Sequence, residues 1–220
     1  MAKTSDLLNA VVSGNTEQVR KLVLQNHGCA SARDAQGVSA LMHAIYRRQN
    51  DAIAILLNAH SQLDIFEAAS VGRTERVKEL IAQSPALVNA YSADGFTALH
   101  FAAYFVQPAA ASLLIGHGAN VTAVAKNATE VMPIHSAASS RNIAVLRELL
   151  KNGAPVDARQ QGGWTALHAA AQNGDIETIE ALLEHGADPA ASNNDGKTAA
   201  DLAREKGHQQ IVDRLATLMS

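Results

Sequence analysis

The sequence predicts an all-α protein built from stacked helix–turn–helix layers, and three observations support this prediction. A pattern of about 33 residues recurs along the 220-residue chain. Of these residues 47% are hydrophobic but only 4% are aromatic, and alanine accounts for much of the hydrophobic total. Small helical residues allow helices to pack closely in thin layers, whereas one large core usually needs bulkier side chains. The sequence therefore favours a helical solenoid.

The clearest layer covers residues 164–190, which read WTALHAAAQNGDIETIEALLEHGADPA. A first helix is expected after Thr165 and is interrupted at Gly174. Asp175 can cap a second helix, and Gly186 can end it in the left-handed conformation that glycine tolerates. The second helix has one apolar face, formed by Ile176, Ile179, Leu182 and Leu183. One such layer cannot bury both of its faces alone, so it requires neighbours.

A glycine position between the two helices of a layer places seven layers along the chain. The position is occupied by Gly14, Arg48, Gly72, Val106, Arg141, Gly174 and Gly207. Successive positions are separated by 34, 24, 34, 35, 33 and 33 residues. The expected repeats span about residues 3–35, 36–61, 62–94, 95–128, 129–162, 163–195 and 196–220. Because they fill the chain, we expect a single repeat domain without a separate linker.

Short motifs recur in phase with this period and indicate a family. TALH at 97–100, MPIH at 132–135 and TALH at 165–168 resemble the TPLH signature of ankyrin repeats. The resemblance implies stacked helix pairs with short connecting β-hairpin loops, and it makes residues 3–35 and 196–220 degenerate caps. It also implies that the recurring histidine ties neighbouring repeats together through hydrogen bonds to the backbone.

Two departures from the regular pattern are expected to change the stack locally. The 24-residue step between Arg48 and Gly72 lacks about nine residues, roughly the size of one connecting hairpin. The third repeat would then place Phe66 at the histidine position, and the short join should tilt or tighten the stack. The loop at 123–133 has two extra residues and should protrude.

Composition disfavours several classes of partner and location. The formal net charge is −3 and the isoelectric point is about 6.3, so the chain lacks the basic surface that nucleic acid or an anionic membrane attracts. Cys29 is the only cysteine, so an internal disulfide is excluded and a reducing cytoplasm is the expected location. The first residues do not form a secretory signal, and no apolar run is long enough to span a membrane.

The sequence predicts no catalytic, cofactor or metal site. A histidine ladder spaced by one repeat cannot place several nitrogens within about 2.1 Å of one ion, so a structural role is favoured for His100, His135 and His168. Cys29 occupies a slot that alanine fills in later repeats, and it is expected to be a structural residue. Nucleophile-elbow and phosphate-loop motifs are missing, so we expect a protein that is not an enzyme.

Charge and aromatic side chains are unevenly distributed along the chain. Between Leu80 and Ala125 the only charged side chain is Asp94. The same stretch contains five of the eight aromatic residues, namely Tyr91, Phe96, Phe101, Tyr104 and Phe105. Depletion of charge together with enrichment of aromatic residues is typical of the core of a protein–protein interface.

The resemblance to ankyrin proteins implies where a partner would bind. The family usually holds partners on its concave side, through the residue before the TPLH motif and the pair before the glycine position. The candidate partner-binding residues are therefore Tyr46, Arg47, Phe96, Tyr104, Phe105, Val131, Trp164 and Gln172. Phe66 and Phe101 are expected in or near the core, and Tyr91 in a hairpin. The alternative is that the aromatic rings only fill space left by the small alanines.

The sequence thus predicts a non-enzymatic module that binds a partner protein as a scaffold, an inhibitor or a tether. One alternative is a self-associating structural protein that uses the uncharged outer helix of the fourth repeat, at residues 108–116. Another alternative is a small-ligand binder. We expect a monomer in the absence of a partner, with a homodimer as the alternative.

Overall fold

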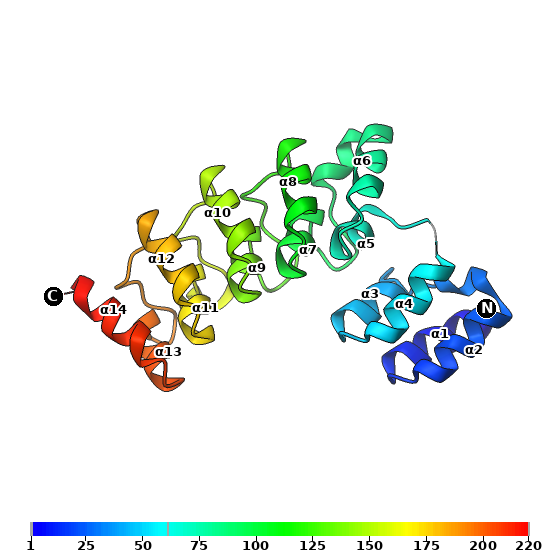
Figure 1. Ribbon diagram of the computed structural model, residues 1–220, viewed down its shortest axis with the longest axis horizontal. Coiled ribbons are helices and arrows are strands. Elements are labelled where there is room, and N and C mark those ends of the chain that lie inside the picture. Colours follow the sequence, from blue (N-terminus) through cyan, green and yellow to red (C-terminus); the bar gives the residue numbers. More distant parts are fainter. Residues whose placement is uncertain (1, 61, 220) are drawn as a thin grey trace. The chain divides into compact units, whose positions relative to one another are not determined.

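The computed structural model describes residues 2–60 and 62–219, and it divides into two compact units, Met1–Ala68 and Ala69–Ser220. Within the described ranges the chain forms α-helices and short 3-10 helices but no extended strand (Figure 1). The prediction of an all-α repeat fold is confirmed. The boundary between the units falls inside the third expected repeat, close to the shortened join.

The first unit contains two layers of paired helices. Its helices are α1 (Ala2–Val12), α2 (Thr16–Gln25), α3 (Ala40–Tyr46) and α4 (Asn50–Ala59), with a 3-10 helix η1 (His27–Ser31). Helix α1 packs against α3, and α2 packs against α4, so equivalent helices of the two layers are neighbours. Helix α5 (Ile65–Ser70) begins in the first unit and ends in the second.

The second unit continues the same arrangement with regular layers. Its helices are α6 (Thr74–Gln83), α7 (Ala98–Tyr104), α8 (Pro108–Gly116), α9 (Pro133–Ser139), α10 (Ile143–Lys151), α11 (Ala166–Asn173), α12 (Ile176–Glu184), α13 (Ala199–Glu205) and α14 (Gln209–Met219), with 3-10 helices η2 (Pro85–Asn89) and η3 (Gln161–Gly163). The helices α7, α9, α11 and α13 stack in chain order, and α6, α8, α10 and α12 stack beside them (Figure 1).

The core of each layer combines alanine on the first helix with leucine or isoleucine on the second. Ala102, Ala137 and Ala170 on successive first helices are completely buried. They face a supporting row of buried aliphatic side chains that includes Leu146 and Leu182. Because an alanine methyl group occupies little space, neighbouring first helices approach closely, as the composition predicts.

The turn between the two helices of a layer adopts a left-handed conformation in every repeat. Positive φ angles occur at Gly14, Gly72, Gly174 and Gly207, and at the three positions where another residue replaces glycine: Arg48 (54°), Val106 (57°) and Arg141 (58°). The position used to count the repeats therefore requires a left-handed backbone, whichever residue occupies it. Valine is the most costly of the three replacements, because its branched side chain clashes in this conformation.

Replacing Val106 by glycine is expected to raise the free energy of unfolding by about 1 kcal/mol. Glycine relieves the strain at positive φ, and Val106 is 51% exposed, so little packing is lost. Urea unfolding followed by circular dichroism measures the change. The matched control is Val12→Gly at the exposed end of α1, where φ is not positive, and this variant should be less stable than wild type. A Val106→Gly variant that is less stable than wild type would contradict the claim that the positive φ of Val106 costs stability.

Connecting loops carry the expected hairpins in reduced form. Single antiparallel bridges join Arg33 to Ser39, Tyr91 to Thr97 and Ser192 to Thr198. The longer loop at 123–133 is tied to both neighbouring loops. The Lys126 N–H donates to the Gly95 carbonyl at 2.8 Å, and the Thr129 carbonyl accepts from the Gln161 N–H at 3.0 Å. The tip of this loop, residues 128–130, is exposed.

At the short join, the prediction that Phe66 takes the histidine position is wrong. Glu67 makes the capping contact instead: its carboxylate accepts from the Asp64 N–H at 2.9 Å, and its own N–H donates to Asp64 at 2.8 Å. The error arises because α5 has six residues where α7 has seven, so counting back from Gly72 misses the position by one. Phe66 itself is half-buried, in agreement with its expected place near the core.

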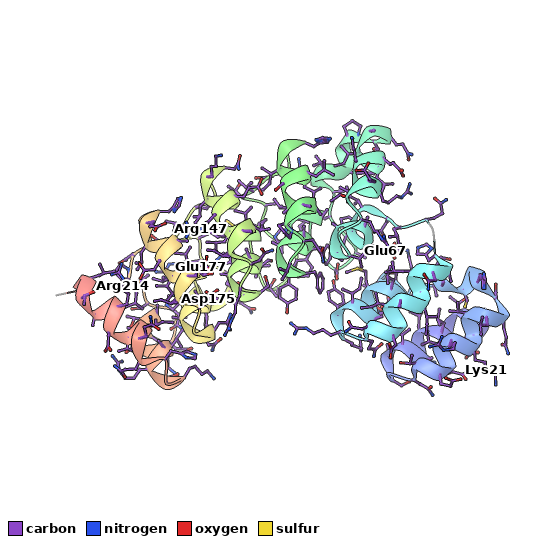
Figure 2. All side chains as sticks on the ribbon, in the orientation of Figure 1. Lys21, Glu67, Arg147, Asp175, Glu177 and Arg214 are labelled. Carbon is purple, nitrogen blue, oxygen red and sulfur yellow. The ribbon has the colours of Figure 1, made fainter. Side chains whose placement is uncertain are left out.

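A buried ionic cluster in the first unit supports the join. The Glu67 side chain is completely buried at the start of α5 (Figure 2). The Arg33 guanidinium lies 2.8 Å from the Asp64 carboxylate and 3.7 Å from that of Glu67, and His60 Nε2 lies 3.5 Å from Glu67. A buried carboxylate requires such partners because desolvation of an isolated charge is costly. Side-chain contacts thus replace the missing hairpin.

Candidate protein-binding surface

The aromatic residues of the fourth repeat form one continuous cluster on and beside α7. The Phe96 and Phe101 rings meet edge to face with centroids 5.7 Å apart, and Phe101 and Phe105 stack at 6.4 Å. The Tyr104 ring meets Phe105 edge to face at 5.2 Å. These distances and angles are favourable for aromatic pairs. The structure therefore brings three of the predicted site residues, Phe96, Tyr104 and Phe105, into one place.

Exposure separates the rings that pack from the rings that could contact a partner. Phe101 is only 3% exposed and belongs to the core, as expected. Phe96 and Phe105 are half-buried against it, which agrees in part with the space-filling alternative. Tyr104 is 44% exposed and forms the outward edge of the cluster. The cluster is thus anchored in the core on one side and accessible on the other.

The two helices of the repeat that holds this cluster carry almost no charge. Helices α7 and α8 contain no acidic or basic side chain apart from two histidines, His100 within α7 and His117 just after α8. Burial lowers the pKa of His100 to about 4, so this imidazole is uncharged at pH 7. A partner that buries this surface would desolvate little charge, and that favours an apolar contact.

Two of the three recurring histidines, His100 and His168, join neighbouring repeats, which confirms at these positions the role that the family resemblance implies. His100 Nδ1 accepts from the Thr97 N–H at 3.2 Å, so Nε2 carries the proton and donates to the Val131 carbonyl at 3.0 Å. His135 Nδ1 likewise accepts from the Met132 N–H at 2.9 Å, but its Nε2 donates at 2.8 Å to the Ala158 carbonyl, which belongs to the same repeat. His168 Nε2 lies 3.1 Å from the Lys197 carbonyl.

The same burial lowers the pKa of His135 and His168 below the ordinary value of 6.5. Desolvation of the charged imidazolium is the main cause for both, and the hydrogen bonds to backbone carbonyls oppose it only in part. Among the described residues, no three histidine, cysteine, aspartate or glutamate side chains gather in a way that could hold a metal ion. Cys29 is buried, and its thiol contacts the Leu22 carbonyl at 3.7 Å.

The remaining site residues of the second unit lie in the fifth and sixth repeats. Val131 and Trp164 are half-buried and precede α9 and α11, as Phe96 precedes α7. The Trp164 ring lies 5.9 Å from that of His168 in its own repeat. Gln172 is half-buried near the end of α11, and its carbonyl accepts from His208 Nε2 at 3.2 Å. Val131 and Trp164 thus occupy the same position in successive repeats, and Gln172 occupies the position that Tyr104 has in the fourth repeat.

Tyr46 and Arg47 belong to the first unit, at the end of α3. Both are exposed, and the Arg47 guanidinium donates to the His43 carbonyl at 3.3 Å. They occupy the same repeat position as Tyr104 and Phe105 at the end of α7. Each pair thus stands directly before the left-handed turn of its own repeat.

One residue of this surface was missed by reasoning from the sequence. Val106 is 51% exposed and follows Tyr104 and Phe105 directly, in the left-handed conformation described above. The available signal was the replacement of glycine by valine in the turn of the aromatic repeat. A strained, exposed apolar residue beside an aromatic cluster is a common feature of functional surfaces.

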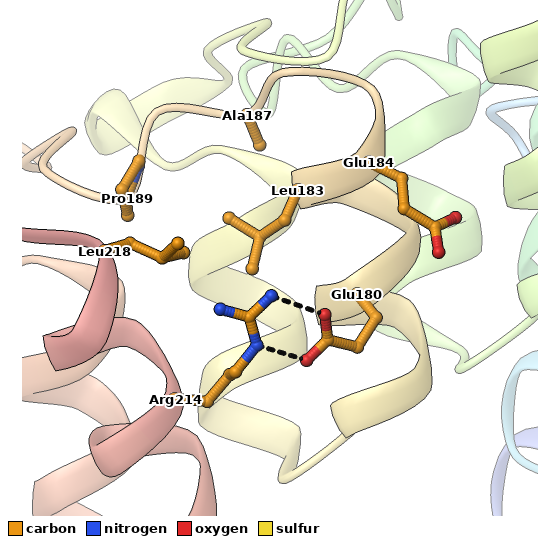
Figure 3. Close-up of a pocket in the computed structure, with 7 residues that line it drawn as sticks. All are labelled: Glu180, Leu183, Glu184, Ala187, Pro189, Arg214 and Leu218. Atoms are coloured by element: carbon orange, nitrogen blue, oxygen red, sulfur yellow. Dashed lines mark hydrogen bonds and ion pairs between the residues drawn. The ribbon is translucent and has the colours of Figure 1, made fainter.

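Two hollows on the outer helices were also not predicted. One lies between α12 and α14 and is lined by Glu180, Leu183, Glu184, Ala187, Pro189, Arg214 and Leu218 (Figure 3). The other lies between α2 and α4 in the first unit and is lined by Arg20, Val23, Leu24, His27, Ile55, Asn58 and Ala59. Each depends on contacts between different repeats, which local sequence patterns do not reveal.

Paired helices in stacked layers, left-handed turns and bridged loops define a helical repeat protein. Comparison with known families matches residues 134–219 to "Ankyrin repeats (3 copies)" and residues 94–126 to "Ankyrin repeat". The chain belongs to the ankyrin repeat family. Ankyrin repeats are generally protein–protein interaction modules without enzymatic activity.

A curated relative agrees with this assignment. The chain is 31% identical over 169 residues to the "Ankyrin repeat domain-containing protein SAT10" of Stachybotrys chartarum. The alignment covers 75% of this chain but only 8% of that much longer protein. Among the residues that the structure describes, no helix has both the length and the apolar character needed to cross a membrane.

Proposed function

We propose that this protein is a non-enzymatic module that binds one partner protein through the aromatic surface of its fourth repeat. The observation that supports this most is the joint presence of an exposed Tyr104, an adjacent ring cluster and a helix pair, α7 and α8, without carboxylate, lysine or arginine. Val131, Trp164 and Gln172 would extend the contact over the next two repeats, on the concave side. The module would act as a scaffold, an inhibitor or a tether.

The energetics of interfaces support a central role for the aromatic side chains. Binding energy concentrates in a few buried aromatic or arginine residues, each of which can contribute about 2 kcal/mol or more. Tyr104 and Trp164 offer large apolar faces with few rotatable bonds, so little entropy is lost when a partner covers them. The strain at Val106 gives a second reason, since a cost in stability beside Tyr104 is consistent with a surface retained for binding.

We propose that the seven repeats act as one domain and that Tyr46 and Arg47 also contact the partner. We propose a cytoplasmic location, where a free thiol such as that of Cys29 stays reduced. Self-association through α8 has less support, because its exposed residues Pro108, Ala109, Ser112 and Gly116 are small and Ser112 already bonds to Glu148. Light scattering coupled to size exclusion should therefore give a monomer.

The test is affinity capture from the source organism's lysate, with wild type, Tyr104→Ser and Leu24→Ser as baits. A partner identified by mass spectrometry should be retained by wild type and by Leu24→Ser, whose exposed leucine lies in the first unit. Calorimetry with the purified partner should show roughly 30-fold weaker binding to Tyr104→Ser, which corresponds to about 2 kcal/mol. Circular dichroism checks that all three proteins are folded.

A partner that binds Tyr104→Ser as tightly as wild type would overturn the proposed surface. If Tyr104→Ser does lose affinity, calorimetry on Trp164→Ser shows whether the contact with the partner extends to the sixth repeat. Unchanged affinity in that variant, with loss in Tyr104→Ser, would restrict the surface to the fourth repeat.

A further inference from the structure

A hollow on the outer side of the last two repeats combines an apolar floor with two carboxylates, Glu180 and Glu184, among its lining residues. It measures about 400 Å³ and lies between α12 and α14 (Figure 3). Leu183 and Leu218 face each other across it, with Ala187 and Pro189 beside them (Figure 3). At one end the Arg214 guanidinium donates two hydrogen bonds, of 2.7 and 2.8 Å, to the Glu180 carboxylate. That pair closes one end of the hollow and leaves the leucines accessible at the other.

The apolar floor exists because α14 extends past the surface that its neighbour covers. Ile211 and Leu215 are buried on the inner side of α14. Leu218 continues the same stripe one turn further, yet it is 46% exposed. An aliphatic side chain from another molecule could therefore bury apolar area here without displacing any part of this chain.

Charge around the hollow is predominantly negative. Together α12 and α14 carry four carboxylates, on Glu177, Glu180, Glu184 and Asp213, against one guanidinium, on Arg214. From α10, Arg147 lies 3.3 Å from Glu184, but both side chains are largely exposed, so the pair is weak and a cation of a partner could replace Arg147. Helix α12 ends at Glu184, beside the hollow, and the carbonyls of its last turn add partial negative charge.

The hollow in the first unit lacks this excess of carboxylates, because α2 and α4 together carry two carboxylates and two cations. Its rim carries Arg20, it measures about 210 Å³, and its leucine, Leu24, is 72% exposed. The two sites therefore share an exposed leucine between outer helices and differ in the neighbouring charge, which is negative at one and balanced at the other. This difference provides a matched control within the same chain.

We propose that the hollow between α12 and α14 binds a basic amphipathic helix of a partner protein. An aliphatic side chain of that helix inserts between Leu183 and Leu218. A lysine or arginine one turn away pairs with Glu184 and the carbonyl end of α12. This second docking surface is separate from the aromatic surface, and it sets the chemistry of its ligand: apolar on one face and cationic beside it.

The test uses a helical peptide of about 18 residues, five turns, made only of leucine and lysine on opposite faces. Isothermal titration calorimetry should show saturable binding to wild type that weakens as salt is raised. The Leu218→Ser variant should bind at least roughly tenfold more weakly, because burial of one leucine is worth about 1.5 kcal/mol or more. The controls Leu24→Ser and Tyr104→Ser should bind as wild type does.

Four results would overturn the proposal. The first is a lack of binding to wild type, and the second is equal binding of a leucine–glutamate peptide of the same length. The third is equal loss in Leu218→Ser and Leu24→Ser, which would indicate adsorption to any exposed leucine. Loss in Tyr104→Ser alone would place the peptide on the aromatic surface, which also contradicts a site at α12 and α14 and leaves the proposed function untouched.

Discussion

Replacing Arg33 by methionine is expected to lower the free energy of unfolding of the first unit by about 2 kcal/mol. The guanidinium is the permanent positive charge beside the completely buried Glu67, and it also bonds to Asp64 at 2.8 Å. Removal of one partner from a buried ion pair typically costs about 3–5 kcal/mol because the other charge stays desolvated. We expect the smaller value because the Arg33 side chain is partly exposed.

The neutral double variant separates charge from packing in this cluster. In Arg33→Met/Glu67→Gln the buried charge is gone, while the glutamine oxygen can still accept from the Asp64 N–H. Most of the lost stability should return, as measured by urea unfolding. The matched control is Arg147→Met, which breaks an exposed cross-helix pair with Glu184 and should change stability by less than about 0.5 kcal/mol. Equal losses of stability in Arg33→Met and Arg147→Met would show that the burial of Glu67 does not determine the cost of removing its partner.

Acidification from pH 7.5 to 4.5 is expected to remove roughly 2–3 kcal/mol of stability through His100 alone. Burial holds the pKa of His100 at about 4 in the folded protein, against an ordinary value of 6.5. Between these values the unfolded chain binds a proton that the folded chain does not, so stability falls as pH falls. The contribution is fully present above about pH 6.5. His135 and His168 act in the same direction because burial lowers their pKa as well.

Urea unfolding at a series of pH values measures this effect in wild type and in His100→Gln. The variant should be less stable at pH 7.5, since the bond to the Val131 carbonyl is weakened, but its stability should fall less steeply below pH 6.5. NMR of the imidazole nitrogens should show a neutral ring protonated at Nε2 at pH 6. A His100 ring that becomes protonated near pH 6.5 in the folded protein would contradict the structure.

The repeat architecture could be predicted because a solenoid is local. Each layer contacts only its neighbours, so spacing within about 33 residues contains most of the required information. The positive φ at Val106 and Arg141 illustrates this, since the period alone placed them in the turn that glycine otherwise occupies. The aromatic enrichment of the fourth repeat was visible in the same way, and it led to Phe96, Tyr104 and Phe105.

Position within a repeat and exposure to solvent depended on the tertiary structure. Phe96 and Phe105 were predicted to face a partner, yet both are half-buried against the Phe101 ring. Glu67 replaced Phe66 at the capping position because α5 is one residue shorter than its counterparts, and its burial depends on Arg33, a residue distant in the chain. The hollow at Leu218 likewise requires two helices from different repeats. Local spacing specifies turns and helix faces, whereas contacts between distant residues follow only from packing.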